Sequence, residues 1–135
     1  MDTNAAPVEV VAGIVVDGGR VLLCHRSAAR TWYPDVWDLP GGHRERGEPP
    51  ARALVRELEE ELGIVIEEPS GPEFRHLRTG KFDMRVWIVT RWAGSPTNAS
   101  PEEHDEVAWM SAQELSGLPL AHHSYPFMIA QALTT

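Results

Sequence analysis

Three glutamates near the middle of the chain, Glu57, Glu60 and Glu61, have the spacing of a metal site. Residues three and four positions apart lie on one side of an α-helix, so a helix here would gather the three carboxylates. Like charges at this spacing cost a helix about 0.2–0.5 kcal/mol per pair. No Lys or Arg follows in the last turn to offset them. The alternatives are a divalent cation, for which carboxylate oxygens suit Mg²⁺ or Mn²⁺, and a solvated glutamate-rich face.

The surrounding residues predict the helix that would carry these glutamates. Pro49-Pro50 suit a helix start, because proline at the first helical positions lacks only an N–H that would have no partner there. Apolar residues then recur at helical spacing and form a stripe that would face a core: Ala51, Leu54, Val55, Leu58 and Leu62. Gly63 suits the helix end. A sharp turn at Gly41-Gly42 and a polar loop over residues 43–48 should deliver the chain to this helix.

Residues 42–64 read GHRERGEPPARALVRELEEELGI and fit the pattern G-x5-E-x7-R-E-U-x-E-E-x-G-U, where U is a bulky aliphatic residue. The pattern resembles the signature of the Nudix hydrolases, and every defined position matches. A match at this many spaced positions favours a metal site over a solvated helix face. The resemblance implies hydrolysis of a nucleoside diphosphate linked to another group, X, by water attack on phosphorus. It also implies an α/β fold in which a mixed β-sheet is sandwiched between helices.

The resemblance assigns roles residue by residue. Glu57 matches a glutamate that ligates metal or acts as the general base, and Arg56 matches an arginine that orients the glutamates. Glu48 matches the early glutamate of the signature, which usually supports the metal ligands through hydrogen bonds. The implied ligands of Mg²⁺, for which Mn²⁺ can substitute, are the carbonyl of Gly41 and the carboxylates of Glu57, Glu60, Glu61 and Glu103.

Glu103 is the expected ligand from outside the signature. The candidates for this position are four acidic residues: Glu102, Glu103, Asp105 and Glu106. Glu103 lies six residues before Trp109, which is the spacing of the MutT branch of the family. A solvated acidic loop is the alternative.

Substrate contacts are also expected outside the signature. Arg26 ends the apolar run VLLCHR and matches a basic position that reaches substrate phosphates in MutT-like members. The alternative for Arg26 is a surface arginine at a strand end. Trp32 and Tyr33 precede the glycine turn, and either ring could stack on a base or pack at the rim of the core. The adjacent His122-His123 are interpreted as loop residues.

The short chain is most similar to the MutT branch, whose members convert (d)NTPs, including oxidised forms, to the monophosphate and pyrophosphate. Members of that branch often read the base with an Asn before a proline near the last helix, whereas this chain has Ser124-Tyr125-Pro126 there. The difference disfavours 8-oxoguanine. A nucleotide-sugar or ADP-ribose-type diphosphatase is the alternative enzyme, although Gly80 occupies a position where ADP-ribose hydrolases often carry proline. A non-catalytic nucleotide-sensing module is less favoured, because no glutamate of the signature is lost.

Length and composition predict a single domain. The chain has 135 residues, 42% of them hydrophobic, which allows one core in residues 8–135 after a loose N-terminus, residues 1–7. The net charge of −8 argues against a nucleic-acid polymer as partner and leaves a small nucleotide. The single cysteine, Cys24, is interpreted as an inert strand residue and favours the reducing cytoplasm. We see no secretory signal or membrane span, and the family resemblance allows a homodimer.

Strands and helices are expected to alternate along the chain. A hairpin is predicted over residues 8–16 and 20–24, because Asp17-Gly18-Gly19 forms a turn between two apolar runs. Further strands are predicted over residues 36–39, 74–78, 82–92 and 106–110. A Ser-x-x-Glu capping box predicts a short helix over residues 111–115, and residues 125–133 predict a closing helix. This interleaving is typical of a mixed α/β domain.

Overall fold

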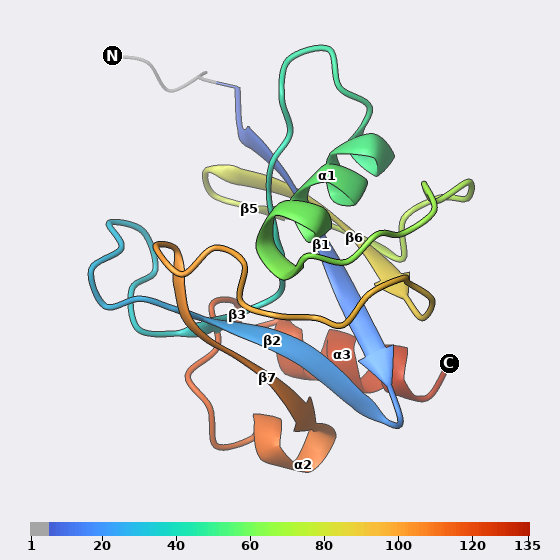
Figure 1. Ribbon diagram of the computed structural model, residues 1–135. Helices are drawn as coiled ribbons and strands as arrows, with labels where there is room; N and C mark the ends of the chain where they lie inside the picture. The colour runs from blue at the N-terminus through green and yellow to red at the C-terminus, as the bar shows by residue number, and fades with distance from the viewer. Residues whose placement is uncertain (1–5) are drawn as a thin grey trace.

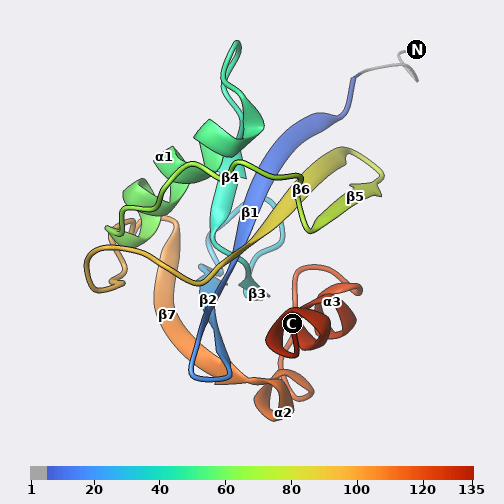
Figure 2. The same cartoon turned by 90° about the vertical axis from the view of Figure 1, so that its right-hand side faces the viewer.

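The computed structural model describes residues 6–135, and in this part of the chain a mixed seven-stranded sheet lies between helices. Helix α1 (Pro50–Leu62) covers one face, whereas α2 (Ala112–Leu115) and α3 (Tyr125–Leu133) lie on the other (Figure 1, Figure 2). The predicted α/β fold is therefore confirmed. Of the N-terminal segment expected to be loose, residues 1–5 lie outside the described residues, and Ala6 and Pro7 have no regular secondary structure.

The central strand, β1 (Val8–Asp17), ends in a hairpin to β2 (Arg20–Arg26). Gly18 and Gly19 have φ values of 58° and 77°, and a two-residue turn of this kind requires positive φ at both positions. The predicted hairpin forms, but only its tip is paired, at Val16 with Val21 and Asp17 with Arg20. Away from the tip, β1 takes other partners and becomes the centre of the sheet.

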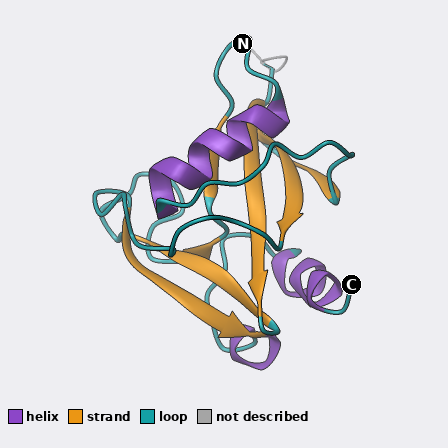
Figure 3. Cartoon of the chain, turned by 45° about the vertical axis from the view of Figure 1, so that its right-hand side comes forward, coloured by secondary structure: helices purple, strands orange, loops and turns teal. Residues whose placement is uncertain are grey.

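The remaining strands are β3 (Trp37–Asp38), β4 (Gly41–His43), β5 (Arg75–Thr79), β6 (Phe82–Val89) and β7 (His104–Ser111). Strand β6 runs parallel to β1 from the Val8–Phe82 pair to the Val15–Val89 pair, and β5 pairs antiparallel with β6. Strand β7 pairs with the outer side of β2. On its other edge β1 pairs first with β4 and then with β2, so the sheet divides there (Figure 3).

The strands of the hairpin are apolar at successive positions because the sheet is covered on both faces. Alternate residues contribute to two separate cores. The core under α1 contains Val11, Val15, Leu22 and Cys24 from the strands, with Leu54, Leu58 and Leu62 from the helix. The core under α3 contains Ala12, Ile14, Val21 and Leu23 from the strands, with Tyr125, Met128 and Ile129 from the helix.

Gly41 and Gly42 do not form the sharp turn that the sequence predicts. They belong to β4 and pair with Ala12 and Val11 of β1. The glycines serve a close backbone approach, because a Cβ on Gly41 would lie 2.0 Å from the carbonyl oxygen of Val11. The capping box of α2 and the bounds of α3 are as predicted.

Candidate active site

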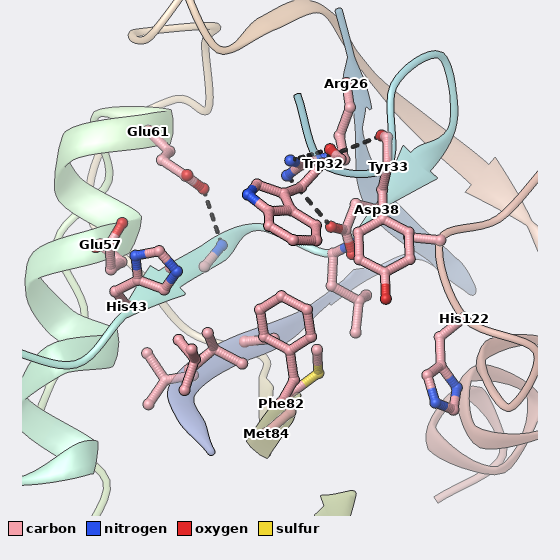
Figure 4. A pocket seen from close by; sticks show the side chains of 18 of the residues that line it. Arg26, Trp32, Tyr33, Asp38, His43, Glu57, Glu61, Phe82, Met84 and His122 are labelled. Carbon is pink, nitrogen blue, oxygen red and sulfur yellow. Dashed lines mark hydrogen bonds and ion pairs between the residues drawn. The ribbon is translucent and has the colours of Figure 1, made fainter. Parts of the chain in front are cut away.

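A cavity of about 450 Å³ opens beside α1 and extends toward α3, a volume in the range of small-molecule sites. Two groups of lining residues differ in chemistry. The acidic end comprises Gly41, Glu57, Glu61 and Glu103. The aromatic end comprises Trp32, Tyr33, Asp38, Phe82, Met84 and Tyr125. Figure 4 shows Glu57 and Glu61 on α1 at one side of the cavity and Tyr33 and Asp38 at the other.

The acidic end brings two carboxylates of α1 against β4. Glu57 and Glu61 are only 9% and 4% exposed, although they lie beside the apolar stripe rather than in it. The N–H of Gly41 donates a hydrogen bond of 2.8 Å to Oε1 of Glu61. A Cβ on Gly42 would lie 2.5 Å from the carboxyl carbon of Glu57. The two glycines therefore let the carboxylates approach the strand directly.

Burial makes both carboxylates costly to ionise. It raises the pKa of Glu61 well above its usual value, and the nearby charge of Glu57 raises it further, against the hydrogen bond from Gly41. Burial also raises the pKa of Glu57, although the charge of Arg56 partly lowers it. Desolvated oxygen donors of this kind fit a hard divalent cation, which would offset the repulsion between them.

Arg56 is the centre of a network at the outer side of the acidic end. Its guanidinium donates to both carboxylate oxygens of Glu48, at 2.8 and 3.0 Å, and to Oε1 of Glu57 at 3.0 Å. A fourth bond, of 3.0 Å, reaches the carbonyl of His43. The hydrogen bond from Arg56 lowers the pKa of Glu48 to about 2. Arg56 thus ties α1 to the loop before it and holds one oxygen of Glu57.

The structure does not place all the expected metal ligands in the cavity. The side chain of Glu60 is 55% exposed and lies outside the lining, with Oε2 3.3 Å from Nη1 of Arg56. Glu48 also lies outside the lining. Gly41, Glu57, Glu61 and Glu103 line it together.

Glu103 is the one acidic residue of the four candidates that lines the cavity. The N–H of Ser27 and Nη1 of Arg30 donate to its carbonyl, at 3.4 and 3.3 Å. Its negative charge contributes to the raised pKa of both Glu57 and Glu61. Asp105 instead accepts a bond of 2.6 Å from Nδ1 of His25 and does not line the cavity.

The loop that carries Trp32 and Tyr33 reaches across the mouth of the cavity. Both side chains line it and are 52% and 46% exposed. Nζ of Lys81 lies 4.5 Å from the centre of the Trp32 ring, and the ring centres of Tyr33 and Phe82 are 6.0 Å apart. The loop therefore touches the β5–β6 hairpin through aromatic contacts, so an occupant of the cavity would lie beside these rings.

Arg26 lines the cavity and also anchors this loop. Its Nη2 donates to the carbonyl of Trp32 at 2.6 Å and its Nε to the carbonyl of Tyr33 at 3.0 Å. Its Nη1 lies 3.7 Å from Oδ2 of Asp38. Tyr33 and Asp35 have positive φ values of 48° and 60°, which non-glycine residues adopt only when neighbours hold them. The predicted contact with phosphate remains a prediction, whereas the anchoring contacts are present.

A polar pair at the far end of the cavity, Asp38 and Tyr125, was not predicted from the sequence. The hydroxyl of Tyr125 donates a bond of 2.8 Å to Oδ1 of Asp38, and burial raises the pKa of Asp38. The available signal was an aspartate inside the apolar run VWDLP. His122, read as a loop residue, also lines the cavity. Its Nδ1 accepts from the N–H of Ser124 at 2.9 Å, which assigns the ring proton to Nε2.

The sheet between helices and the glutamate cluster behind its glycine strand define a known class of domain. The family model for the NUDIX domain matches residues 7–131, and the chain belongs to the Nudix family. It is a Nudix-type pyrophosphohydrolase, a hydrolase of acid anhydrides. Nudix hydrolases generally use a divalent metal ion.

Two curated relatives and one solved structure show where the chain sits in this family. It is 33% identical over 125 residues to the CTP pyrophosphohydrolase of Escherichia coli (strain K12), covering 91% of this chain and 90% of that protein. It is 32% identical over 108 residues to the 8-oxo-dGTP diphosphatase of the same strain, covering 77% and 80%.

The crystal structure of a MutT NUDIX hydrolase from Burkholderia pseudomallei superimposes with a TM-score of 0.81 at 28% identity, over 94% of this chain and 98% of that one. The predicted family and fold are confirmed. Among residues 6–135, no helix has the length and apolar character needed to cross a membrane.

Proposed function

We propose that the chain hydrolyses a nucleoside triphosphate to the monophosphate and pyrophosphate in the presence of Mg²⁺. The observation that carries this proposal is a single cavity with carboxylates at one end and aromatic rings at the other. A nucleotide has the same polarity, with anionic phosphates at one end and a flat base at the other. The intact signature and the relatives named for triphosphate substrates support the same reaction.

The acidic end would hold Mg²⁺ through Glu57, Glu61, Glu103 and the carbonyl of Gly41, with Glu60 added from the outer side. When bound, Mg²⁺ supplies charge stabilisation on the transferring phosphoryl group and lowers the pKa of the attacking water. Glu57 can also accept the proton of that water, because Arg56 holds its Oε1 and opposes the effect of burial on its pKa. Arg56 and Glu48 act by positioning Glu57.

The aromatic end would receive the nucleoside. Trp32 and Tyr33 can stack on the base, and Asp38, Tyr125 and His122 offer hydrogen bonds to its edge. Arg26 reaches the phosphates in this proposal while it retains the loop. CTP is the first substrate to test, because the relative that covers 91% of this chain is a CTP pyrophosphohydrolase. Hydrolysis of another nucleoside diphosphate linked to X is the alternative.

The remaining expectations concern partners and location. A net charge of −8 supports a small nucleotide rather than a nucleic-acid polymer as the partner. The single cysteine supports the cytoplasm, and a homodimer stays an expectation from the family.

The test is a phosphate-release screen with Mg²⁺, run with and without added inorganic pyrophosphatase. The substrates are canonical and oxidised (d)NTPs, nucleotide sugars, ADP-ribose and dinucleoside polyphosphates. Phosphate that appears only when pyrophosphatase is present, from a (d)NTP, is the expected result. Turnover of X-linked diphosphates alone would show that these, and not nucleoside triphosphates, are the substrates. Tight nucleotide binding without any turnover would favour the sensing module.

A further inference from the structure

A second group of metal-binding side chains lies behind the acidic end of the cavity. Cys24 of β2, Glu61 of α1 and His104 of β7 each offer one ligand atom, and these atoms all lie within 4.8 Å of one another. All three residues are buried. Only Glu61 belongs to the Nudix signature, so the thiol and the imidazole have no role in the proposed hydrolysis.

The imidazole of His104 is buried without a hydrogen-bond partner. The residue is 3% exposed, and within residues 6–135 its Nδ1 has no partner. Its Nε2 lies 3.9 Å from Oε2 of Glu61, which is too long for a hydrogen bond. A buried imidazole is normally paired, and no side-chain hydrogen bond among the described residues fixes this one, so the ring can offer Nε2, its nitrogen near Glu61, to an ion. A neutral imidazole offers one nitrogen lone pair, which is the group through which histidine binds a metal ion.

The spacing of the three ligand atoms fits one ion after a small contraction. Tetrahedral Zn²⁺ with sulfur, nitrogen and oxygen ligands sets neighbouring ligand atoms roughly 3.3–3.7 Å apart. Oε2 of Glu61 and Nε2 of His104 are nearly at this separation, at 3.9 Å, and Cys24 must approach by at most about 1.5 Å. The β2–β7 register shifts between His25 and Arg26, opposite the start of β7, so the strand ladder is irregular next to His104.

We propose that Cys24, Glu61 and His104 bind a thiophilic divalent ion such as Zn²⁺ or Co²⁺. Glu61 and His104 line the cavity, whereas Cys24 does not, so the ion enters from the cavity and keeps a fourth position open toward it. Binding converts the Cys24 thiol to a thiolate and releases its proton to solvent. The bound ion provides the positive charge that a thiolate otherwise lacks beside Glu61, Asp38 and Glu103.

This ion would inhibit hydrolysis. Glu61 cannot serve the Mg²⁺ of the acidic end and the thiophilic ion in the same way, because both use its carboxylate. Zn²⁺ should therefore compete with Mg²⁺ even when the nucleotide is saturating. This inhibition rests on the proposed hydrolase function, whereas the binding of the ion does not.

Cobalt spectroscopy of the full chain tests the binding directly. Cys24 is the single cysteine of the chain, so a thiolate-to-Co²⁺ charge-transfer band in the near ultraviolet reports this residue alone. The metal-free protein should develop the band on titration with Co²⁺, saturate at one equivalent and lose the band when Zn²⁺ is added. Absence of the band in the folded wild-type protein would overturn the proposal without any variant.

Variants then assign the other ligands. Cys24→Ser should abolish the band and weaken Zn²⁺ binding, measured by competition with a chromophoric chelator. A direct ligand should cost at least about the 10-fold that loss of an outer-shell partner costs. His104→Gln should reduce Zn²⁺ affinity similarly, whereas Glu60→Gln, which removes a carboxylate next to Glu61, should keep the band. Unchanged Zn²⁺ affinity in both Cys24→Ser and His104→Gln would contradict the site.

Inhibition separates this proposal from the proposed function. Each protein is assayed at one fixed, non-saturating Mg²⁺ concentration, with and without Zn²⁺, and its rate is compared with its own rate without Zn²⁺. Wild-type activity should fall and recover when Zn²⁺ is chelated, whereas Cys24→Ser should resist. A cobalt band in a protein with no hydrolytic activity would support the ion site and refute the hydrolase. Hydrolytic activity without a cobalt band would support the hydrolase and refute the ion site.

Discussion

The two ends of the cavity are held by two arginines in different ways. At the acidic end, Arg56 bonds carboxylates on α1 and in the loop before it, and Glu57, one of the side chains that it holds, is buried. At the aromatic end, Arg26 bonds backbone carbonyls, and the side chains of Trp32 and Tyr33 remain half exposed. At the acidic end the catalytic side chains themselves are held in place. At the aromatic end the loop backbone is held, whereas the rings of Trp32 and Tyr33 can adjust. We expect the rate of the chemical step to depend on the first end and the choice of nucleotide on the second.

Replacing Glu57, the proposed general base, should have the largest effect on catalysis. Glu57→Gln keeps the volume of the side chain but removes the charge, so kcat should fall about 10²–10⁴-fold. The loss should be the same for every nucleotide, because the change is confined to the acidic end. The matched control is Glu59→Gln, on the same helix but exposed. Steady-state kinetics at saturating Mg²⁺ measure the change in kcat. An unchanged kcat would show that Glu57 is not the general base.

Changing the polar pair should alter selectivity. Asp38→Asn exchanges one acceptor oxygen for a donor, so a base that bonds to Asp38 loses its partner. An unpaired buried group costs about 1–3 kcal/mol, so the ratio of kcat/KM between two bases should move about 10-fold. Tyr125→Phe is the companion variant, since it leaves the ring in the core and removes the hydroxyl that bonds to Asp38 and contacts the sulfur of Met84. If the ratio of kcat/KM between the two bases is the same in the wild type and both variants, Asp38 and Tyr125 do not select the base.

Removing one aromatic ring should have a smaller effect. Stacking on an aromatic side chain contributes about 1–3 kcal/mol per base, and the half-exposed Trp32 should lie at the lower limit. Trp32→Ala should therefore raise KM about 5-fold, with kcat little changed. Trp32→Phe retains a ring and should recover most of the affinity. A fall in kcat with unchanged KM would show that this loop serves the chemistry instead.

The smallest effect should concern stability and pH. Glu48 has its pKa lowered from 4.5 to about 2 in the folded protein by the hydrogen bond from Arg56. A lowered pKa means that the ionised form stabilises the fold above pH 4.5, and that this contribution disappears as the pH falls through 2. Glu48→Gln should lower the free energy of unfolding at pH 7, and the difference from wild type should shrink on acidification. Urea unfolding measures it, with Glu67→Gln, an exposed glutamate away from Arg56, as control.

Most of the acidic end could be predicted from the sequence because all its parts except Glu103 lie within one short segment of the chain. Glu57 and Glu61 share one helix, and the glycine strand that receives them lies within the same short segment. The aromatic end could not be predicted in the same way. Asp38 and Tyr125 are 87 positions apart in the chain and meet only because α3 packs beneath β3. Trp32 and Tyr33 were expected near the substrate, but their contacts with Lys81 and Phe82 depend on how β5 and β6 add to the sheet.

One local expectation was wrong for reasons of packing, and the interpretation of Cys24 stays untested. The Gly41-Gly42 pair looks like a turn in the sequence, yet its lack of side chains serves a strand pressed against β1 and Glu57. Cys24 reads as an inert apolar residue, and burial agrees with that. Its nearness to His104 and Glu61 comes from the pairing of β2 with β7 and the position of α1, which no local pattern contains.

The division of the sheet into two cores affects how such a protein can evolve. The helix with the glutamates rests on one core, whereas Tyr125 of the polar pair and Trp37, the neighbour of Asp38 in the chain, belong to the other. A mutation that remodels the nucleoside end therefore disturbs packing on the side of the sheet away from the catalytic helix. Proteins with this fold can therefore change their substrate during evolution and keep the same reaction. One fold with a fixed reaction and many substrates is the expected product of that arrangement.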